Sequence, residues 1–219
     1  MNQSTDYTSE REQMVRKQIE ARGIDNPQVL EAMRSVPRHR FVPENMVSMA
    51  HADRPLPIGQ DQTISQPYIV AYMTQCLRLR GGERVLEIGT GLGYQAAVLS
   101  RIASEVCSIE RFPDLADRAR EILASLGYDN VSITCGDGTK GWPEKAPFDG
   151  IIATASGPRV PESLKDQLRM GGRIVMPVGS YRMGQHIVRL TKGSGDRFQE
   201  ENLLGVAFVP MVGEEGWEK

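Results

Sequence analysis

Residues 84–93, RVLEIGTGLG, decide the fold, because a short apolar strand runs directly into three spaced glycines. In a doubly wound α/β fold, ligands bind beyond the carboxyl ends of the strands, commonly at the first strand-to-helix turn. Glycines let the backbone of such a turn approach a ligand closely. The spacing is GxGxG, and Tyr94 stands where a dinucleotide fingerprint has its last glycine. The turn therefore favours a ligand with a carboxylate and an ammonium, and Glu87 would help to balance the ammonium.

Strands alternate with helices on the C-terminal side of this motif. Apolar runs predict strands at 84–88, 106–109, 131–135, 148–154 and 173–178, and helical patterns predict helices through about 103, at 113–126 and at 161–168. Alternation of this kind implies parallel βαβ units and a doubly wound, mostly parallel sheet. No helix separates the last two predicted strands, 186–191 and 203–209. We expect these two to pair antiparallel at one edge of the sheet.

The first 80 residues predict a helical extension that packs on a core of residues 81–219 to form one compact unit. A capping-box pair at Ser9 and Glu12 predicts the start of its first helix, and Gly23 the end. An Asn26-Pro27 step predicts a second helix to about residue 33, and Pro67 begins a third with an apolar stripe. Between them, prolines predict irregular structure up to residue 59.

Composition excludes several classes of protein. The chain has 219 residues, 40% of them hydrophobic and 25% charged, with a net charge of −2, which is typical of a globular domain and not of a basic nucleic-acid binder. Its densest basic cluster predicts a solvated edge: Arg34, Arg38, His39 and Arg40. Polar residues interrupt the longest uncharged run, residues 62–77, so we expect no membrane span, and the N-terminus shows no secretory signal.

Cysteine and histidine usage predicts neither disulfides nor a metal. Cys76, Cys107 and Cys135 are odd in number and far apart, which favours buried, reduced thiols in a cytoplasmic protein. The three histidines have no metal-ligand spacing.

Acidic residues end the two strands that follow the glycine turn. Glu110 closes the second predicted strand, where a carboxylate commonly accepts both ribose hydroxyls of an adenosine. Asp137 follows the third strand, where it can accept from the amine of adenine. Either acid alone is more often a solvated charge. The glycine turn and the two acids follow one another at the ends of successive strands. Together they look like the site of a class I S-adenosylmethionine (SAM)-dependent methyltransferase, with S-adenosyl-L-homocysteine as product. The cofactor-binding residues predicted from the pattern are Glu87, Gly89, Gly91, Gly93, Glu110, Gly136 and Asp137.

A second stretch of sequence is more specific for one family than the glycine turn is. Residues 57–67, PIGQDQTISQP, resemble the signature of the protein-L-isoaspartate (D-aspartate) O-methyltransferase family, whose members repair damaged aspartyl and asparaginyl sites. Residues 36–43, 87–99, 108–111 and 148–179 are similar to that family too, so the resemblance covers about residues 11–213. It implies methyl transfer from SAM to the free α-carboxylate of L-isoaspartyl residues, which starts repair through a succinimide.

The resemblance also assigns site residues. It places the active-site serine at Ser65 and a segment that closes over the cofactor at Gln62, Thr63, Ile64 and Ser65. It assigns the peptide substrate to Ile64, Ser65, Val206, Ala207 and Phe208. The family usually has a basic residue in the string Val-x-Phe-Val-Pro, but this chain has Ala207, which puts a side-chain contribution there in doubt. From the residues alone, Ser65 could equally cap the helix that begins at Pro67.

Three other functions remain as alternatives. Another class I methyltransferase, acting on a small molecule or RNA, would share the cofactor site but should lack the segment QTISQP. An NAD-dependent oxidoreductase is disfavoured by Tyr94 and by the lack of an acid or base at a hydride site. A non-enzymatic SAM-binding module is disfavoured by Ser65. The expected partners are isoaspartyl peptides and proteins, with no nucleic acid, membrane or metal, and we expect a monomer.

Overall fold

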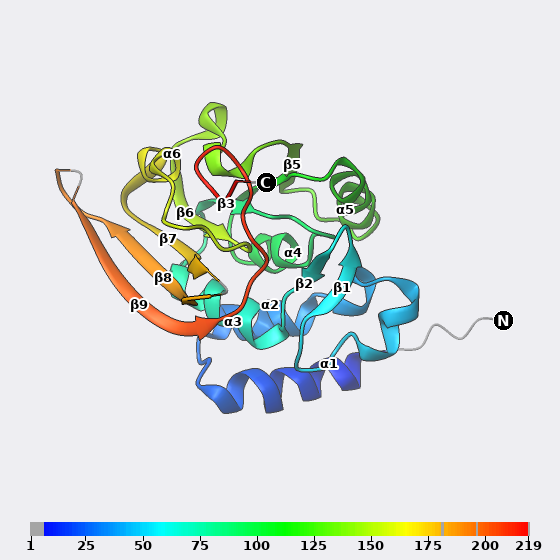
Figure 1. Ribbon diagram of the computed structural model, residues 1–219. Helices are drawn as coiled ribbons and strands as arrows, with labels where there is room; N and C mark the ends of the chain where they lie inside the picture. Colours follow the sequence, from blue (N-terminus) through cyan, green and yellow to red (C-terminus); the bar gives the residue numbers. More distant parts are fainter. Residues whose placement is uncertain (1–6, 181, 196, 219) are drawn as a thin grey trace.

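A seven-stranded sheet forms the centre of the computed structural model, which describes residues 7–180, 182–195 and 197–218 (Figure 1). The strand order is β5-β4-β3-β6-β7-β8-β9. β3 to β7 pair in parallel, whereas β8 and β9 are antiparallel, so the predicted sheet and its antiparallel edge are confirmed. The bounds are β3 (Arg84–Ile88), β4 (Glu105–Glu110), β5 (Val131–Cys135), β6 (Phe148–Ala153), β7 (Leu168–Ser180), β8 (Gly184–Lys192) and β9 (Phe198–Val206).

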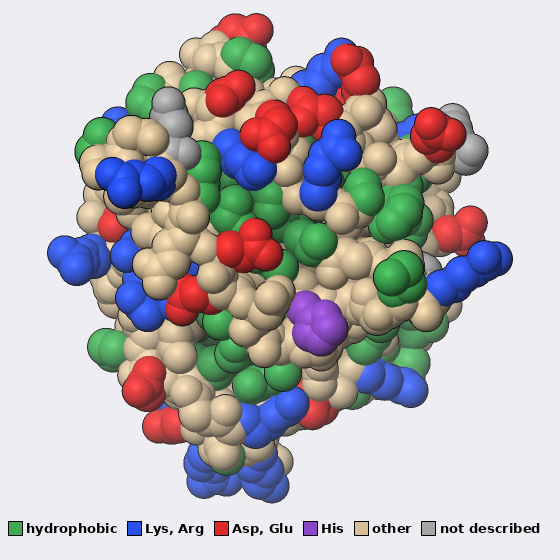
Figure 2. Space-filling view, turned by 60° about the vertical axis from the view of Figure 1, so that its left-hand side comes forward, with side chains coloured by type: hydrophobic (Ala, Val, Ile, Leu, Met, Phe, Trp, Pro, Cys, Tyr) green, Lys and Arg blue, Asp and Glu red, His purple; other side chains and the backbone are tan. Residues whose placement is uncertain are grey.

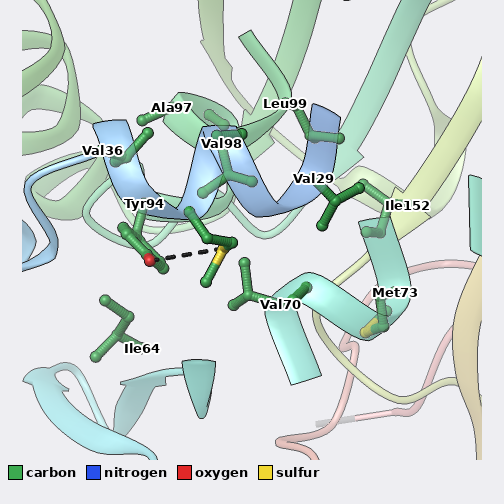
Figure 3. Packing of buried hydrophobic residues seen from close by; sticks show 14 of the residues in the cluster. Val29, Val36, Ile64, Val70, Met73, Tyr94, Ala97, Val98, Leu99 and Ile152 are labelled. Carbon is green, nitrogen blue, oxygen red and sulfur yellow. Dashed lines mark hydrogen bonds between the residues drawn. The ribbon is translucent and has the colours of Figure 1, made fainter. Parts of the chain in front are cut away.

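Both faces of the central strands β3, β4 and β6 are buried, which explains why these strands read as mostly apolar runs. Adjacent residues of β3, Val85 and Leu86, belong to two different core clusters, because successive side chains of a strand point to opposite faces. Helices α3 (Pro67–Leu77), α4 (Tyr94–Ser100) and α5 (Pro113–Ser125) pack in the first cluster and α6 (Glu162–Asp166) in the second. Figure 3 shows the first cluster where α3 and α4 meet the N-terminal helices.

The N-terminal segment shares that first cluster with the sheet. Helix α1 (Thr8–Met14) continues through η1 (Val15–Ile19) and η2 (Glu20–Arg22) to Gly23, as predicted. The capping-box prediction is wrong, because Tyr7 is the N-cap and Ser9 lies inside the helix. Helix α2 (Pro27–Ser35) begins as predicted, with Asn26 Oδ1 accepting from two backbone N–H groups.

The sequence patterns missed a hairpin, β1 (Leu56–Gly59) and β2 (Gln62–Ile64). Its two-residue loop, Gln60 and Asp61, has φ of +53° and +55°, the left-handed conformation that tight hairpins need. Neither residue is glycine, Pro55 precedes the first strand and Pro57 lies within it, so the usual signals for a hairpin are absent. Short helical turns complete the chain: η3 (Arg38–Phe41), η4 (Glu44–Met49), η5 (Gly138–Lys140) and η6 (Pro143–Lys145).

Several predicted boundaries are wrong. Helix α4 ends at Ser100 and α6 spans only five residues. Strand β7 begins at Leu168 because its pairing with β6 continues across an irregularity next to Phe148. Strand β9 begins at Phe198 and ends at Val206, because pairing with β8 orders its polar first half, where apolar patterning gives no signal.

Two predictions of exposure are also wrong. Arg38 is fully buried, although its basic neighbours suggested a solvated edge. Cys135 is exposed, whereas Cys76 and Cys107 are buried as predicted. Within the described residues, no helix is both long and apolar enough to cross a membrane.

Candidate functional site

The sheet reverses its winding next to β3, and that reversal creates a crevice. The chain runs from β3 outward to β4 and β5, then returns to the other side of β3 with β6. Ligands of doubly wound folds bind at such a switch point, beyond the carboxyl ends of the strands. The strand ends are joined there by two hydrogen bonds, Gly89 N to Ile109 O at 2.8 Å and Thr154 N to Ile88 O at 2.9 Å. Two adjoining cavities lie at this place.

The first, the Glu110 cavity, is lined by Gly89, Gly91, Glu110, Thr154 and the residues around them. The second, the Ser65 cavity, is lined by Ser65, Thr90, Tyr94, Gln95 and their neighbours. Both cavities share five lining residues, Ile58, Thr63, Gly89, Gly91 and Thr154. A ligand bound on the glycine turn would therefore face both.

Close packing around the turn requires glycine at two positions. Gly89 has φ +92°, and a Cβ there would lie 2.4 Å from the Oγ1 of Thr154. That hydroxyl donates to Gly89 O at 2.7 Å, so it is fixed against the turn. Gly91 has φ +57°, and a Cβ there would approach Ile58 Cδ1 to 2.9 Å. Gly93 lines neither cavity; it precedes α4 and faces Leu123 of α5.

Glu110 is held rigidly at the edge of the crevice. Its Oε2 accepts from Gly91 N at 2.7 Å, and its Oε1 accepts from Arg111 N at 2.7 Å and Phe112 N at 3.0 Å. The residue is 5% exposed and lines the Glu110 cavity. An ionised carboxylate has about four lone-pair sites. Capacity to accept one further hydrogen bond, on Oε2, therefore remains.

Replacement of Glu110 tests the predicted cofactor contact. We expect Glu110→Ala to weaken binding of SAM and of S-adenosyl-L-homocysteine by about 1.5–3 kcal/mol, the value of a hydrogen bond to a charged group. Isothermal titration calorimetry measures this change. Glu121→Ala, at an exposed position on α5, is the control. An unchanged dissociation constant in Glu110→Ala would remove Glu110 from the cofactor site.

Glu87 lies beneath the turn and lines neither cavity. It is fully buried, with Oε2 accepting from Ser108 Oγ, while Ser108 Oγ is 2.6 Å from Thr90 Oγ1. Its Oε1 has no partner among the described residues. Burial raises the pKa of Glu87 to about 8, although the Ser108 hydrogen bond acts in the opposite direction. The carboxyl is therefore mostly protonated at neutral pH, and its contact with a ligand ammonium remains a prediction.

The raised pKa of Glu87 predicts a pH dependence of stability. Between about pH 4.5 and 8 the folded protein holds a proton that the unfolded chain releases, so the free energy of unfolding should fall as pH rises. The loss should be on the order of a few kcal/mol. Urea unfolding at several pH values in this range measures the free energy of unfolding and checks the prediction. Glu87→Gln should flatten the slope, whereas the exposed control Glu121→Gln should keep it; equal slopes in all three proteins would refute the assignment.

Gly136 and Asp137 do not line the cavities either. The Oδ1 of Asp137 accepts from Thr139 N and Oγ1, and its Oδ2 accepts from Glu214 N at 2.8 Å. Burial raises the pKa of Asp137, but these hydrogen bonds outweigh it, so the pKa lies below its usual range. The side chain thus holds the C-terminal segment, and its contact with adenine remains a prediction. The next residue, Gly138, does line the Glu110 cavity.

The C-terminal segment forms a wall that sequence patterns missed. Four consecutive residues line the Glu110 cavity: Val209, Pro210, Met211 and Val212. Two long-range hydrogen bonds secure them, Arg111 Nη1 to Val212 O and Trp217 Nε1 to Ser156 O, both 2.8 Å. These partners lie 101 and 61 residues apart in the chain, so no local signal could have revealed the wall.

The predicted closing segment consists of β2 of the hairpin and Ser65, and its closure over a cofactor remains a prediction. Gln62 and Thr63 line the Glu110 cavity, and Thr63, Ile64 and Ser65 line the Ser65 cavity. Ser65 is half-buried, and its hydroxyl has no hydrogen-bond partner within the described part of the chain. The N-cap of α3 is Gln66, so Ser65 does not cap that helix. Its hydroxyl is therefore available to a ligand.

Of the five residues assigned to the peptide, Ile64 and Ser65 line the Ser65 cavity, whereas the other three lie at the end of the sheet edge and line neither cavity. Val206 is the last residue of β9, and Ala207 is exposed. Phe208 is buried, and its backbone is engaged by Gln185, whose Oε1 accepts from Phe208 N at 2.6 Å and whose Nε2 donates to Phe208 O at 3.2 Å. The N–H of Phe208 is thus not free for a peptide.

Solved structures with this architecture define the class of protein. One structure named protein-L-isoaspartate O-methyltransferase aligns with a TM-score of 0.85 and 30% identity, covering 94% of this chain and 67% of that one. Another, from Plasmodium falciparum and in complex with S-adenosyl-L-homocysteine, aligns with a TM-score of 0.80 and 24% identity, covering 95% and 99%. The fold is that of a SAM-dependent methyltransferase.

Sequence comparison defines the family. Residues 9–216 match the family described as protein-L-isoaspartate(D-aspartate) O-methyltransferase. Protein-L-isoaspartate O-methyltransferase 1 of Rhodopseudomonas palustris (strain HaA2) is 56% identical over 214 residues, covering 98% of this chain and 87% of that protein. The enzyme of the same name from Methanoculleus marisnigri is 56% identical over 209 residues, covering 95% and 94%. The chain belongs to the protein-L-isoaspartate O-methyltransferase family, and the resemblance found in the sequence is confirmed.

Proposed function

We propose that this protein transfers the methyl group of SAM to the free α-carboxylate of L-isoaspartyl residues in damaged proteins and so initiates their repair. One observation supports the proposal at the site: Ser65, whose hydroxyl makes no hydrogen bond within the described residues, lines a cavity that adjoins the glycine turn. Relatives that are 56% identical carry the name of this activity.

The residues around the glycine turn fit SAM. The glycines of the turn let the backbone approach the ligand closely, and Glu110 Oε2 can accept one hydrogen bond from a ribose hydroxyl. The N–H groups of Gly89 and Gly91 already donate to Ile109 O and Glu110 Oε2. The hairpin residues Gln62 and Thr63 cover the same cavity from the other side. When bound, SAM supplies a methyl group that is already activated by its sulfonium. Within the described residues, no group of histidine, cysteine and acidic side chains is arranged to hold a metal.

The chain needs only to position and desolvate the substrate. An α-carboxylate is already ionised at neutral pH, so no general base is required. The Ser65 cavity offers hydroxyl donors at Ser65 and Thr63, and apolar walls at Ile58 and Leu92 that exclude water. Fixed in-line placement can supply up to about 7–11 kcal/mol of the barrier. Ser65 is proposed to donate to the carboxylate oxygen that does not react.

Repair follows from the ester. A methyl ester has a better leaving group than a carboxylate, so the next backbone nitrogen attacks it and methanol leaves. The succinimide that results hydrolyses to normal or isomerised aspartate, and repeated cycles convert the damaged site. Ester formation on the enzyme is therefore the step that the cavity has to support.

The peptide is proposed to lie along the end of β9. Val206 and Ala207 can supply backbone hydrogen bonds, as in β-strand addition, whereas Phe208 can contribute only its side chain and position. Acidic and basic side chains are interspersed over most of the face that carries β8 and β9 (Figure 2). A mixed surface of this kind suits peptides of varied sequence. Free cysteines support a reducing compartment such as the cytoplasm, and we propose a monomer with no nucleic-acid or membrane partner.

One assay separates this function from its alternatives. The protein is incubated with labelled SAM and matched isoaspartyl peptide, aspartyl peptide and RNA. We expect a base-labile methyl ester on the isoaspartyl peptide alone. Label on RNA would support a different methyltransferase, and cofactor binding without any transfer would support a binding module.

A further inference from the structure

Arg38 is a buried cation that joins two loops beside the Ser65 cavity. It is fully buried at the start of η3. Its Nε donates to Ala50 O at 2.7 Å, and its Nη2 donates to Ser65 O at 2.8 Å. One planar guanidinium therefore fixes the carbonyl of Ser65 relative to the loop that contains Ala50.

Tyr94 connects the same guanidinium with the cavity wall. The Arg38 Cζ lies 4.6 Å from the centroid of the Tyr94 ring, and Tyr94 lines the Ser65 cavity. The phenol in turn donates to Met33 Sδ at 3.8 Å, so the ring is fixed from both sides (Figure 3). Burial lowers the pKa of Arg38, and interaction with Tyr94 acts in the opposite direction.

Stability alone is a poor reason for a buried arginine here. No carboxylate pairs with Arg38 among the described residues, and its Nη1 has no partner. Burying a charge costs several kcal/mol, and apolar side chains of similar volume are often at least as stabilising. What the guanidinium adds is geometry, because its rigid fork sets two carbonyls at a defined separation.

Ser65 depends on that geometry. Its hydroxyl has no hydrogen bond in the described part of the chain that would hold its rotamer, and it lies between β2 and α3, outside both elements. Its carbonyl is held by Arg38. A rotation of this peptide unit would turn the Ser65 side chain in the cavity. We propose that Arg38 is a positioning residue for methyl transfer, which acts by fixing the backbone of Ser65; this inference rests on the function proposed above.

A double-mutant cycle tests the inference. In the wild-type background, Arg38→Met should lower kcat for an isoaspartyl peptide by about ten- to hundredfold, the effect of a misplacement on the order of 1 Å. In a Ser65→Ala background, Arg38→Met should change kcat less than about twofold, because the group that it positions is gone. Arg38→Lys keeps the charge and one donor nitrogen, so its kcat should lie between those of the wild type and Arg38→Met.

The controls separate positioning from misfolding. Rates are divided by the fraction of protein that binds S-adenosyl-L-homocysteine in calorimetry, so unfolded protein does not count. Arg40→Met replaces an exposed arginine in the same turn and should leave kcat unchanged. An equal loss in both serine backgrounds, or full turnover in Arg38→Met and Arg38→Lys, would overturn the inference. If the wild-type protein itself fails to methylate the peptide, the proposed function fails first.

Discussion

A Ser65→Ala variant should lose about 10²–10³-fold in kcat for an isoaspartyl peptide, the range observed when one preorganised donor is removed from a reacting site. Its affinity for S-adenosyl-L-homocysteine should stay nearly constant. Loss of turnover without loss of cofactor binding marks an interaction made in the transition state. The expectation follows from the free hydroxyl in the Ser65 cavity, which neither caps α3 nor bonds to another described residue.

Steady-state rates and calorimetry on the same preparation measure the two effects. Ser125→Ala, which removes an exposed hydroxyl on α5, is the matched control and should change neither. If Ser65→Ala folds normally and keeps full turnover, the serine has no catalytic part. The carboxylate would then be held by backbone groups or by the other free hydroxyl of the cavity, that of Thr63.

The enzyme should discriminate between isoaspartyl and normal aspartyl linkages by about as large a factor as the loss of kcat expected for Ser65→Ala. In an isoaspartyl residue the main chain runs through the side-chain carbonyl, and the α-carboxylate hangs on a shorter arm. A normal aspartate carries its carboxylate one methylene further from the main chain. A site that holds the peptide by its backbone at Val206 and Ala207 therefore misplaces the normal carboxylate by about a bond length. We expect a preference of about a hundredfold or more in kcat/KM.

Two peptides that differ only in this linkage provide the measurement. A peptide pair with a changed flanking sequence is the control, since backbone recognition should keep the preference. A ratio below about tenfold would contradict the repair function and favour a less selective carboxyl methyltransferase. A preference that vanishes with new flanking residues would instead indicate recognition of side chains.

The parts of the site that could be predicted are those that the chain encodes locally. The strand and glycine turn of residues 84–93 lie side by side in the sequence, and so do Asn26 and Pro27 at the start of α2. Glu110 was found because the end of β4 is fixed by the parallel topology of the sheet. For the glycine turn and Glu110, the position of a residue relative to the end of a strand was enough to predict that it lies at the site.

The parts that escaped depend on residues far apart in sequence. Arg38 belongs to a basic cluster that predicts exposure, and only its contacts with Ala50 and Ser65 reveal that it is buried. The acid that follows β5, Asp137, stays a predicted adenine ligand, but nothing in the sequence indicated that its carboxylate accepts from Glu214 N, 77 residues away. No period or motif encodes such contacts, because tertiary packing decides them.

The C-terminal wall has a consequence for how the protein is made. Residues 209–212 line the Glu110 cavity, and every strand of the sheet precedes them in the chain. Domains tend to fold from the N-terminus during synthesis, so the parallel strands β3 to β6 can pair before this segment leaves the ribosome. The cofactor site then lacks one wall. The Glu110 cavity would be completed only when the segment has emerged and docked on Asp137 and Ser156.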